Sequence, residues 1–198
     1  MKKFIAGMMV LAGVASLTAS AQNLTLDFPV TVSVASDAID LQGVQLPTSF
    51  GIIGFNTTNL SNNAGGQPRA TVNNVGYAAV DYTASAAVLG TWTLGTAPAQ
   101  NTAVLYGIFT QAVTPADNAE TGRSVAESDF GPEDRLSGVA LRATASALAQ
   151  DSETAAETKG NNVYTTQSFR SLRYRLDAPT DGATDEQTIV VTIGAVAI

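Results

Sequence analysis

The feature of this sequence that most restricts its fold is a strict alternation of apolar and polar residues near its beginning. In residues 24–34 every second residue is apolar: Leu24, Leu26, Phe28, Val30, Val32 and Val34. Because successive side chains of a β-strand point to opposite faces, this period of two predicts a strand with one buried face. Pro29 lies in the polar phase and cannot donate to a strand ladder, which predicts an edge strand or a break at this point.

Short runs of the same character recur along the chain, separated by segments rich in Asn, Gly, Pro and Asp that favour turns. We expect further strands at residues 51–55, 69–73, 77–86, 91–94, 102–109, 136–147, 169–176 and 188–193. Residues 140–157 are the weak point, because they contain many good helix formers, and a short helix near Ala155 stays open. The pattern predicts an all-β fold, an Ig-like or jelly-roll-type β-sandwich of about eight or nine strands.

The first residues have the organisation of a secretory signal peptide. Lys2 and Lys3 precede an apolar run over residues 4–17, and Ala19-Ser20-Ala21 offers a cleavage site before Gln22. The apolar run is shorter than the roughly 20 residues of a spanning helix, and no cysteine follows the cleavage site to carry a lipid. We therefore predict a signal peptide at residues 1–21, periplasmic transit, and a secreted protein, extracellular or at the cell surface, without a stable membrane anchor. Residues 22–198 are expected to form a single sandwich domain, with a split near residues 111–130 left open.

The composition excludes several kinds of chemistry. The chain contains no His and no Cys, so it cannot build a Cys/His zinc site, a thiol nucleophile, a Ser-His-Asp triad or a disulfide. Its 17 acidic residues outnumber its 10 basic residues, and this excess would repel a phosphate backbone. It has no G-x-S-x-G elbow, P-loop or G-x-G-x-x-G fingerprint. We predict a protein that is not an enzyme and does not bind nucleic acid.

An acidic loop is the one candidate for a cofactor. Asp181, Asp185 and Glu186 lie in a Gly-containing segment between two predicted strands, and carboxylate oxygens are ligands that calcium prefers. The spacing lacks the regularity of an EF-hand, and a polar turn explains the same residues. We therefore predict no metal and no cofactor, with calcium kept as the alternative.

Two further sets of residues have both a binding and a structural interpretation. In a strand, Arg173 and Arg175 share one face, which is either a patch for an acidic partner or, as we favour, a solvated face paired with nearby acids. Aromatic residues could stack on sugar rings if they formed an exposed row, but most lie in predicted strands, where a core would contain them. The candidates are Tyr77, Tyr82, Trp92, Tyr106, Tyr164 and Tyr174.

The end of the chain is expected to form a closing hairpin. Its first strand would bury Leu172, Tyr174 and Leu176, and its second strand would bury Ile189, Val191 and Ile193. These two apolar sets should face one another on the core side, with residues 181–186 at the tip of the hairpin.

Two segments resemble parts of known secreted proteins. Residues 73–82 (NNVGYAAVDY) are similar to the N-x-G-x…V-x-Y/F hairpin of secreted Ig-like surface modules. Residues 171–180 (SLRYRLDAPT) followed by 187–193 (QTIVVTI) resemble the closing hairpin of uncharacterised secreted bacterial β-sandwich proteins, some of which are surface-layer or filament subunits. The resemblance implies a sandwich in an extracellular setting and transfers no active-site residue.

These observations predict a secreted, non-enzymatic structural protein of the bacterial cell surface, a self-assembling filament or coat subunit whose partner is a second copy of itself. The alternative is a soluble extracellular binding module for a glycan or a protein, with calcium as a candidate aid. In an assembly, the strand at residues 24–34 could lie in its own sheet, the ordinary outcome, or act as a donor strand that completes the sheet of a neighbour.

Overall fold

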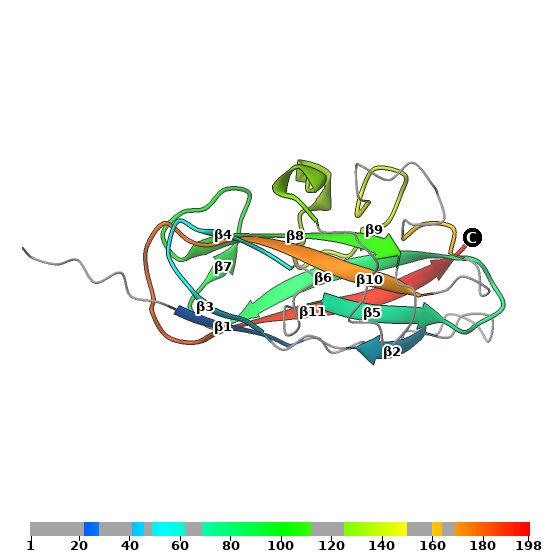
Figure 1. Ribbon diagram of the computed structural model, residues 1–198, viewed down its shortest axis with the longest axis horizontal. Coiled ribbons are helices and arrows are strands. Elements are labelled where there is room, and N and C mark those ends of the chain that lie inside the picture. Colours follow the sequence, from blue (N-terminus) through cyan, green and yellow to red (C-terminus); the bar gives the residue numbers. More distant parts are fainter. Residues whose placement is uncertain are drawn as a thin grey trace, which may run out of the picture.

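In the computed structural model, which describes residues 22–27, 41–45, 49–61, 69–111, 125–149, 160–163 and 169–198, two β-sheets pack over a shared core (Figure 1). The predicted leader at residues 1–21, the segment around Ala155 and most of the proposed boundary at residues 111–130 lie outside the described residues. The predicted all-β sandwich is confirmed.

The first sheet has the strand order β3-β1-β11-β6-β9. Its members are β1 (Gln22–Asp27), β3 (Ser49–Ile53), β6 (Val80–Leu89), β9 (Leu141–Arg142) and β11 (Gln187–Ala197). The second sheet has the order β2-β5-β10-β8-β7, and β4 lies beside β10 off this path. Its members are β2 (Leu41–Gln45), β4 (Thr58–Leu60), β5 (Arg69–Asn74), β7 (Thr93–Leu94), β8 (Thr102–Gln111) and β10 (Arg170–Asp177). Two single turns of 3-10 helix, η1 (Glu127–Asp129) and η2 (Pro132–Asp134), lie in the connection after β8.

The longest ladder of the first sheet joins β6 to β11. The two strands are antiparallel and pair from Thr188 opposite Leu89 to Ala197 opposite Val80. Both strands alternate between buried and partly exposed positions over most of their length, as a period of two requires when one face meets the core. The buried phase of β11 includes Ile189, Val191 and Ile193.

The second sheet is organised around β10. Its whole length pairs with β8, while β5 and β4 lie one after the other along its opposite edge. Leu172, Tyr174 and Leu176 are fully buried, as expected for the apolar phase of this strand. A contact between the rings of Tyr82 in β6 and Phe109 in β8, with centroids 5.2 Å apart, joins the two sheets across the core.

The predicted closing hairpin is correct in its faces and wrong in its pairing. The buried apolar residues of β10 and those of β11 belong to one hydrophobic cluster, so the two apolar faces do meet across the core. However, β10 and β11 lie in different sheets, and the connection between them is an arch rather than a hairpin. Alternation specifies which face of a strand is buried, but it does not specify which edges form hydrogen bonds.

The predicted strand at residues 136–147 is also corrected, because only Leu141–Arg142 forms a strand. The backbone here crosses between the edges of both sheets. The N–H of Leu136 donates to the carbonyl of Leu105 in β8, and the carbonyl of Ser137 accepts from Ala86 in β6. This segment closes the open side of the sandwich. It buries Leu136 and Ala143 without a continuous strand, while Val139 stays exposed. Two strands were not expected: β2, and β4, which falls within a segment rich in Asn and Gly.

The core phase of β11 can be tested with a pair of adjacent substitutions. Val191→Asp places a charge at a fully buried position without a partner and should lower the free energy of unfolding by more than about 3 kcal/mol. Thr192→Asp, on the opposite phase and partly exposed, should cost less than about 1 kcal/mol. Urea unfolding at neutral pH measures both, and similar losses would contradict the assigned register.

Candidate assembly site

β1 is the first described strand of the chain, yet it is an interior strand of its sheet. It pairs antiparallel with β3, from Gln22 opposite Ile53 to Thr25 opposite Ser49, with a register shift after Leu24. On its other edge it pairs in parallel with β11, from Leu24 opposite Gln187 to Asp27 opposite Val190. β1 is therefore not an edge strand, while Pro29, where the sequence predicted an edge strand or a break, lies outside the described residues. Figure 1 shows β1 (dark blue) alongside the beginning of β11 (red).

The register of this pairing agrees with the alternation seen in the sequence. Leu24 is paired with Gln187 and Leu26 with Ile189, and both β11 residues are fully buried. The apolar phase of β1 is therefore aligned with the core phase of β11. The other four residues of the predicted assembly strand, Phe28, Val30, Val32 and Val34, lie outside the described residues.

One edge of β11 is only partly paired within the described residues. β6 follows β11 up to Ala197, whereas β1 accompanies it only as far as Val190. Residues 191–197 have no described strand beside them on the β1 side. This half of β11 includes the buried residues Val191 and Ile193.

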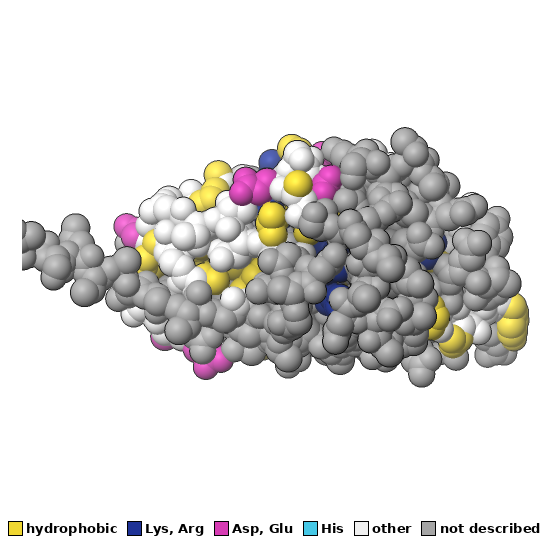
Figure 2. All heavy atoms as spheres, viewed as in Figure 1, with side chains coloured by type: hydrophobic (Ala, Val, Ile, Leu, Met, Phe, Trp, Pro, Cys, Tyr) yellow, Lys and Arg dark blue, Asp and Glu magenta, His cyan; other side chains and the backbone are white. Residues whose placement is uncertain are grey.

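Exposed apolar side chains gather at the end of the sandwich where the chain terminates. Val75 and Tyr77 lie between β5 and β6, and Tyr77 is 79% exposed. Val196 and Ile198 are also exposed and lie nearby, because the N–H of Ile198 donates to the carbonyl of Ala79. We call these four residues the apolar end. Figure 2 shows hydrophobic side chains at the extremity of the molecule where β5 turns into β6.

The acidic loop between β10 and β11 is organised by amide side chains. Gln187 is fully buried, and its Oε1 accepts from the backbone N–H groups of Thr91 and Trp92 at 2.8 and 2.9 Å. Its Nε2 donates to the carbonyl of Asp185 at 3.1 Å. Asn101 holds the other side of the loop, because its Oδ1 accepts from the N–H of Ala183 at 2.7 Å.

The three acidic residues of this loop do not form a cluster. Asp181, Asp185 and Glu186 are exposed, and no group of three or more acidic residues within the described part of the chain could hold a metal ion. The side chain of Asp185 accepts from the hydroxyl of Thr91 at 3.4 Å. Sequence reasoning missed Gln187 as the organising residue. Its position just before an alternating strand was the only available signal.

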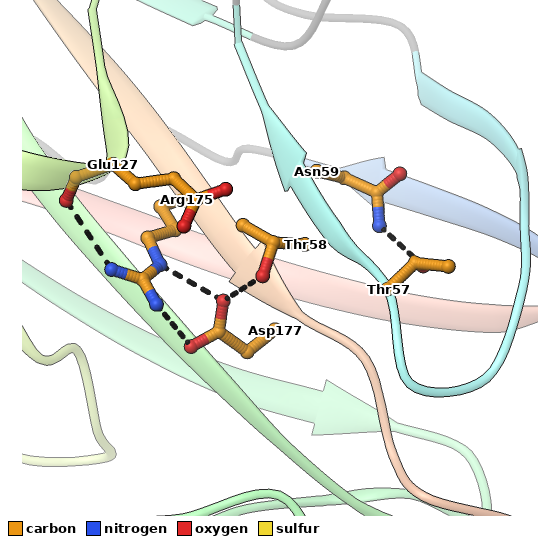
Figure 3. Close-up of polar contacts among 6 residues, drawn as sticks. All are labelled: Thr57, Thr58, Asn59, Glu127, Arg175 and Asp177. Atoms are coloured by element: carbon orange, nitrogen blue, oxygen red, sulfur yellow. Dashed lines mark hydrogen bonds and ion pairs between the residues drawn. The ribbon is translucent and has the colours of Figure 1, made fainter.

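The outer face of the second sheet carries a charged network rather than an open patch (Figure 3). The guanidinium of Arg175 donates from Nε and Nη2 to the two carboxylate oxygens of Asp177, each at 2.9 Å. Asp177 also accepts from the hydroxyl of Thr58 at 2.9 Å, and Nη1 of Arg175 donates to the carbonyl of Glu127 at 3.3 Å. The ring of Tyr106 lies 5.0 Å from the guanidinium carbon. The hydrogen bonds to Asp177 raise the pKa of Arg175.

The expectation of a solvated arginine face holds only in part. Arg175 is paired with a nearby acid, but Arg173 on the same face is fully buried. Burial, with Arg69 beside it, lowers the pKa of Arg173 to about 10. A small second apolar cluster of Ile108, Val125 and Phe130 forms on this side, because the chain after β8 folds back over the sheet.

The aromatic candidates do not form an exposed row among the described residues. Tyr82, Trp92 and Tyr174 are buried, Tyr106 packs against Arg175, and Tyr77 is exposed at the apolar end. Tyr164 lies outside the described residues. The indole N–H of Trp92 donates to the carbonyl of Ala183, so this ring is part of the loop scaffold.

Among the described acidic residues, Asp134 at the end of η2 is the one whose pKa is clearly shifted. Its carboxylate is buried, and Oδ2 accepts from the N–H of Gly131 at 2.7 Å. Burial raises the pKa of Asp134 to about 7, and it outweighs the backbone hydrogen bonds that act in the opposite direction. The hydrogen bond from Gly131 lets the side chain cap η2, the turn in which Asp134 itself lies.

The comparisons with known proteins add no family. Neither a search against protein-family models nor a search of curated proteins found a match to this chain. The resemblance to secreted bacterial β-sandwich proteins therefore stays a prediction. Within the described residues, no helix has the length and apolar character needed to cross a membrane.

The hydrogen bonds of the acidic loop predict that two neighbouring substitutions, at Gln187 and at Asp185, change the free energy of unfolding by different amounts. Gln187→Ala leaves two backbone N–H groups without their acceptor and should lower the free energy of unfolding by about 2–4 kcal/mol. Asp185→Ala should change it by less than about 0.5 kcal/mol. Thermal melts with EDTA and with added calcium check the alternative. A calcium-dependent rise in Tm that Asp185→Ala abolishes would show that the loop is a metal site.

Asp134 predicts a specific pH dependence. Because its pKa is raised on folding, the folded protein binds this proton more tightly than the unfolded chain does. Its contribution to stability is therefore greatest in acid, falls as the pH rises from about 4 to about 7, and levels off above that. The stability of Asp134→Asn relative to the wild type should therefore rise between about pH 4 and about pH 7. A constant difference between the two proteins across this range would contradict the assignment.

Proposed function

We propose that this chain is a secreted, non-enzymatic structural protein that assembles with copies of itself at the bacterial cell surface, as a subunit of a filament or coat. The observation that carries the proposal is the apolar end formed by Val75, Tyr77, Val196 and Ile198. Single exposed apolar residues are common on protein surfaces, but a group at one end of a soluble domain is typical of a protein contact.

The chemistry of the chain supports a contact with protein rather than with a small polar ligand. The sequence has no His or Cys, and its acidic loop is held by Gln187 and Asn101. The charged residues Arg175 and Asp177 neutralise one another. The remaining feature that favours a ligand is apolar surface, which is best covered by another apolar surface.

A second copy is the simplest partner because every copy that the predicted leader exports carries the same apolar end. The net negative charge would keep dispersed subunits soluble, while contacts at the ends would join them. A fibre requires the apolar end to meet a different surface of the next copy, because only a contact between unlike surfaces continues without closing on itself.

This function predicts that the apolar end controls assembly. Tyr77→Ser combined with Val196→Ser should raise the protein concentration needed for assembly about tenfold or more, which corresponds to about 1.4 kcal/mol. Val139→Ser, which removes an equally exposed apolar side chain elsewhere, is the matched control and should have little effect. Sedimentation velocity with negative-stain imaging measures both. Strictly monomeric wild-type particles at all concentrations and salt levels would contradict the proposal.

A further inference from the structure

The first sheet depends on a strand contributed by the beginning of the chain. Within the described residues, β3 is attached to the sheet only through β1, and β1 in turn lies against β11. If β1 left this position, a gap one strand wide would remain between β3 and β11, with unpaired backbone groups on both sides. We call this gap the β1 slot. It requires an extended segment parallel to β11 and antiparallel to β3.

The chain connectivity allows β1 to reach the slot of another molecule. β1 ends at Asp27, and the next described strand, β2, begins at Leu41 in the opposite sheet. The connecting residues 28–40 can span up to about 45 Å when extended. Once the predicted leader at residues 1–21 is removed, β1 begins the chain, and a terminal strand on a connection of this length can enter a neighbouring sheet without unthreading any other element.

We propose that β1 is exchanged between copies, so that the β1 slot of each subunit is filled by β1 of a second copy in the register found here. The inference rests on the proposed self-assembly and names the surface through which it occurs. Leu24 and Leu26 of the incoming strand pair with Gln187 and Ile189 of the acceptor, and Gln22 pairs with Ile53. Backbone hydrogen bonds hold the strand, and the alternation selects the register.

The alternation in the sequence predicts how far the donated strand extends. β1 covers β11 up to Val190, and residues 191–197 continue beyond it without a described partner on that side. The sequence predicts that the strand continues over residues 28–34, a stretch of the same length. A donor strand of this length would cover β11 from end to end.

The exchanged and unexchanged forms contain the same strand contacts, so their balance depends on the connection and on protein concentration. Insertion of β1 into its own slot has an effective concentration of roughly millimolar for a short flexible connection. Exchange should therefore increase with the local concentration of subunits. Because donor strand and acceptor slot are different surfaces, each subunit can give one strand and receive another, which produces a chain of subunits.

The absence of cysteine from the sequence makes disulfide trapping a direct test. Thr25 of β1 is paired with Thr188 of β11, so cysteines at these positions would lie one strand spacing apart, within disulfide range. Two full-length proteins, Thr25→Cys and Thr188→Cys, are unfolded together, refolded, concentrated and oxidised. Thr25→Cys mixed with Thr192→Cys is the matched control, because Thr192 is on the same face of β11 but out of register. Circular dichroism of the reduced proteins verifies folding.

Exchange predicts covalent dimers in the Thr25/Thr188 mixture at least tenfold above the Thr25/Thr192 mixture. It also predicts a ladder of covalent oligomers from one protein carrying both Thr25→Cys and Thr188→Cys. If this double variant assembles but forms only intrachain disulfides, strand exchange is refuted while self-assembly stands. If every variant and the wild type stay monomeric, both proposals are refuted.

Discussion

The first sheet depends on β11, because both edges of this strand are used and every other member is attached through it. β6 and β9 lie on one side of β11, and β1 and β3 lie on the other. Its buried residues Ile189, Val191 and Ile193 also form part of the core that joins the two sheets. β11 therefore holds the first sheet together by hydrogen bonds and also supplies side chains to the core between the two sheets.

The polar groups of the molecule hold connections in place rather than creating a reactive site. The buried amide of Gln187 and the amide of Asn101 fix the arch between β10 and β11, and Arg175 with Asp177 ties β10 to β4 and η1. These hydrogen bonds satisfy donors and acceptors that would be costly to bury alone. The arch in turn positions the beginning of β11, where β1 pairs.

Much of the fold could be predicted from local pattern, because period-two alternation reports which face of a strand is buried. β5, β8, β10 and β11 lie close to their predicted bounds, and the buried faces of β10 and β11 were assigned correctly. Pairing could not be predicted, because backbone hydrogen bonds are formed by groups that all residues share. The arch between the sheets, the interior position of β1 and the broken backbone around Leu141 all result from these non-local contacts. The position of Gln187 just before an alternating strand was too weak a signal, since an amide there is common. The two backbone N–H groups that its Oε1 accepts from belong to Thr91 and Trp92, far away in sequence.

We propose that the strand that completes each first sheet in the assembled state belongs to another copy. An electron cryomicroscopy map of the native assembly tests this claim most directly, through the path of the chain between Asp27 and Leu41. The account predicts that this connection joins β1 in the slot of one subunit to β2 of its neighbour. A connection that returns from β1 to β2 of the same subunit, throughout an ordered assembly, would contradict it.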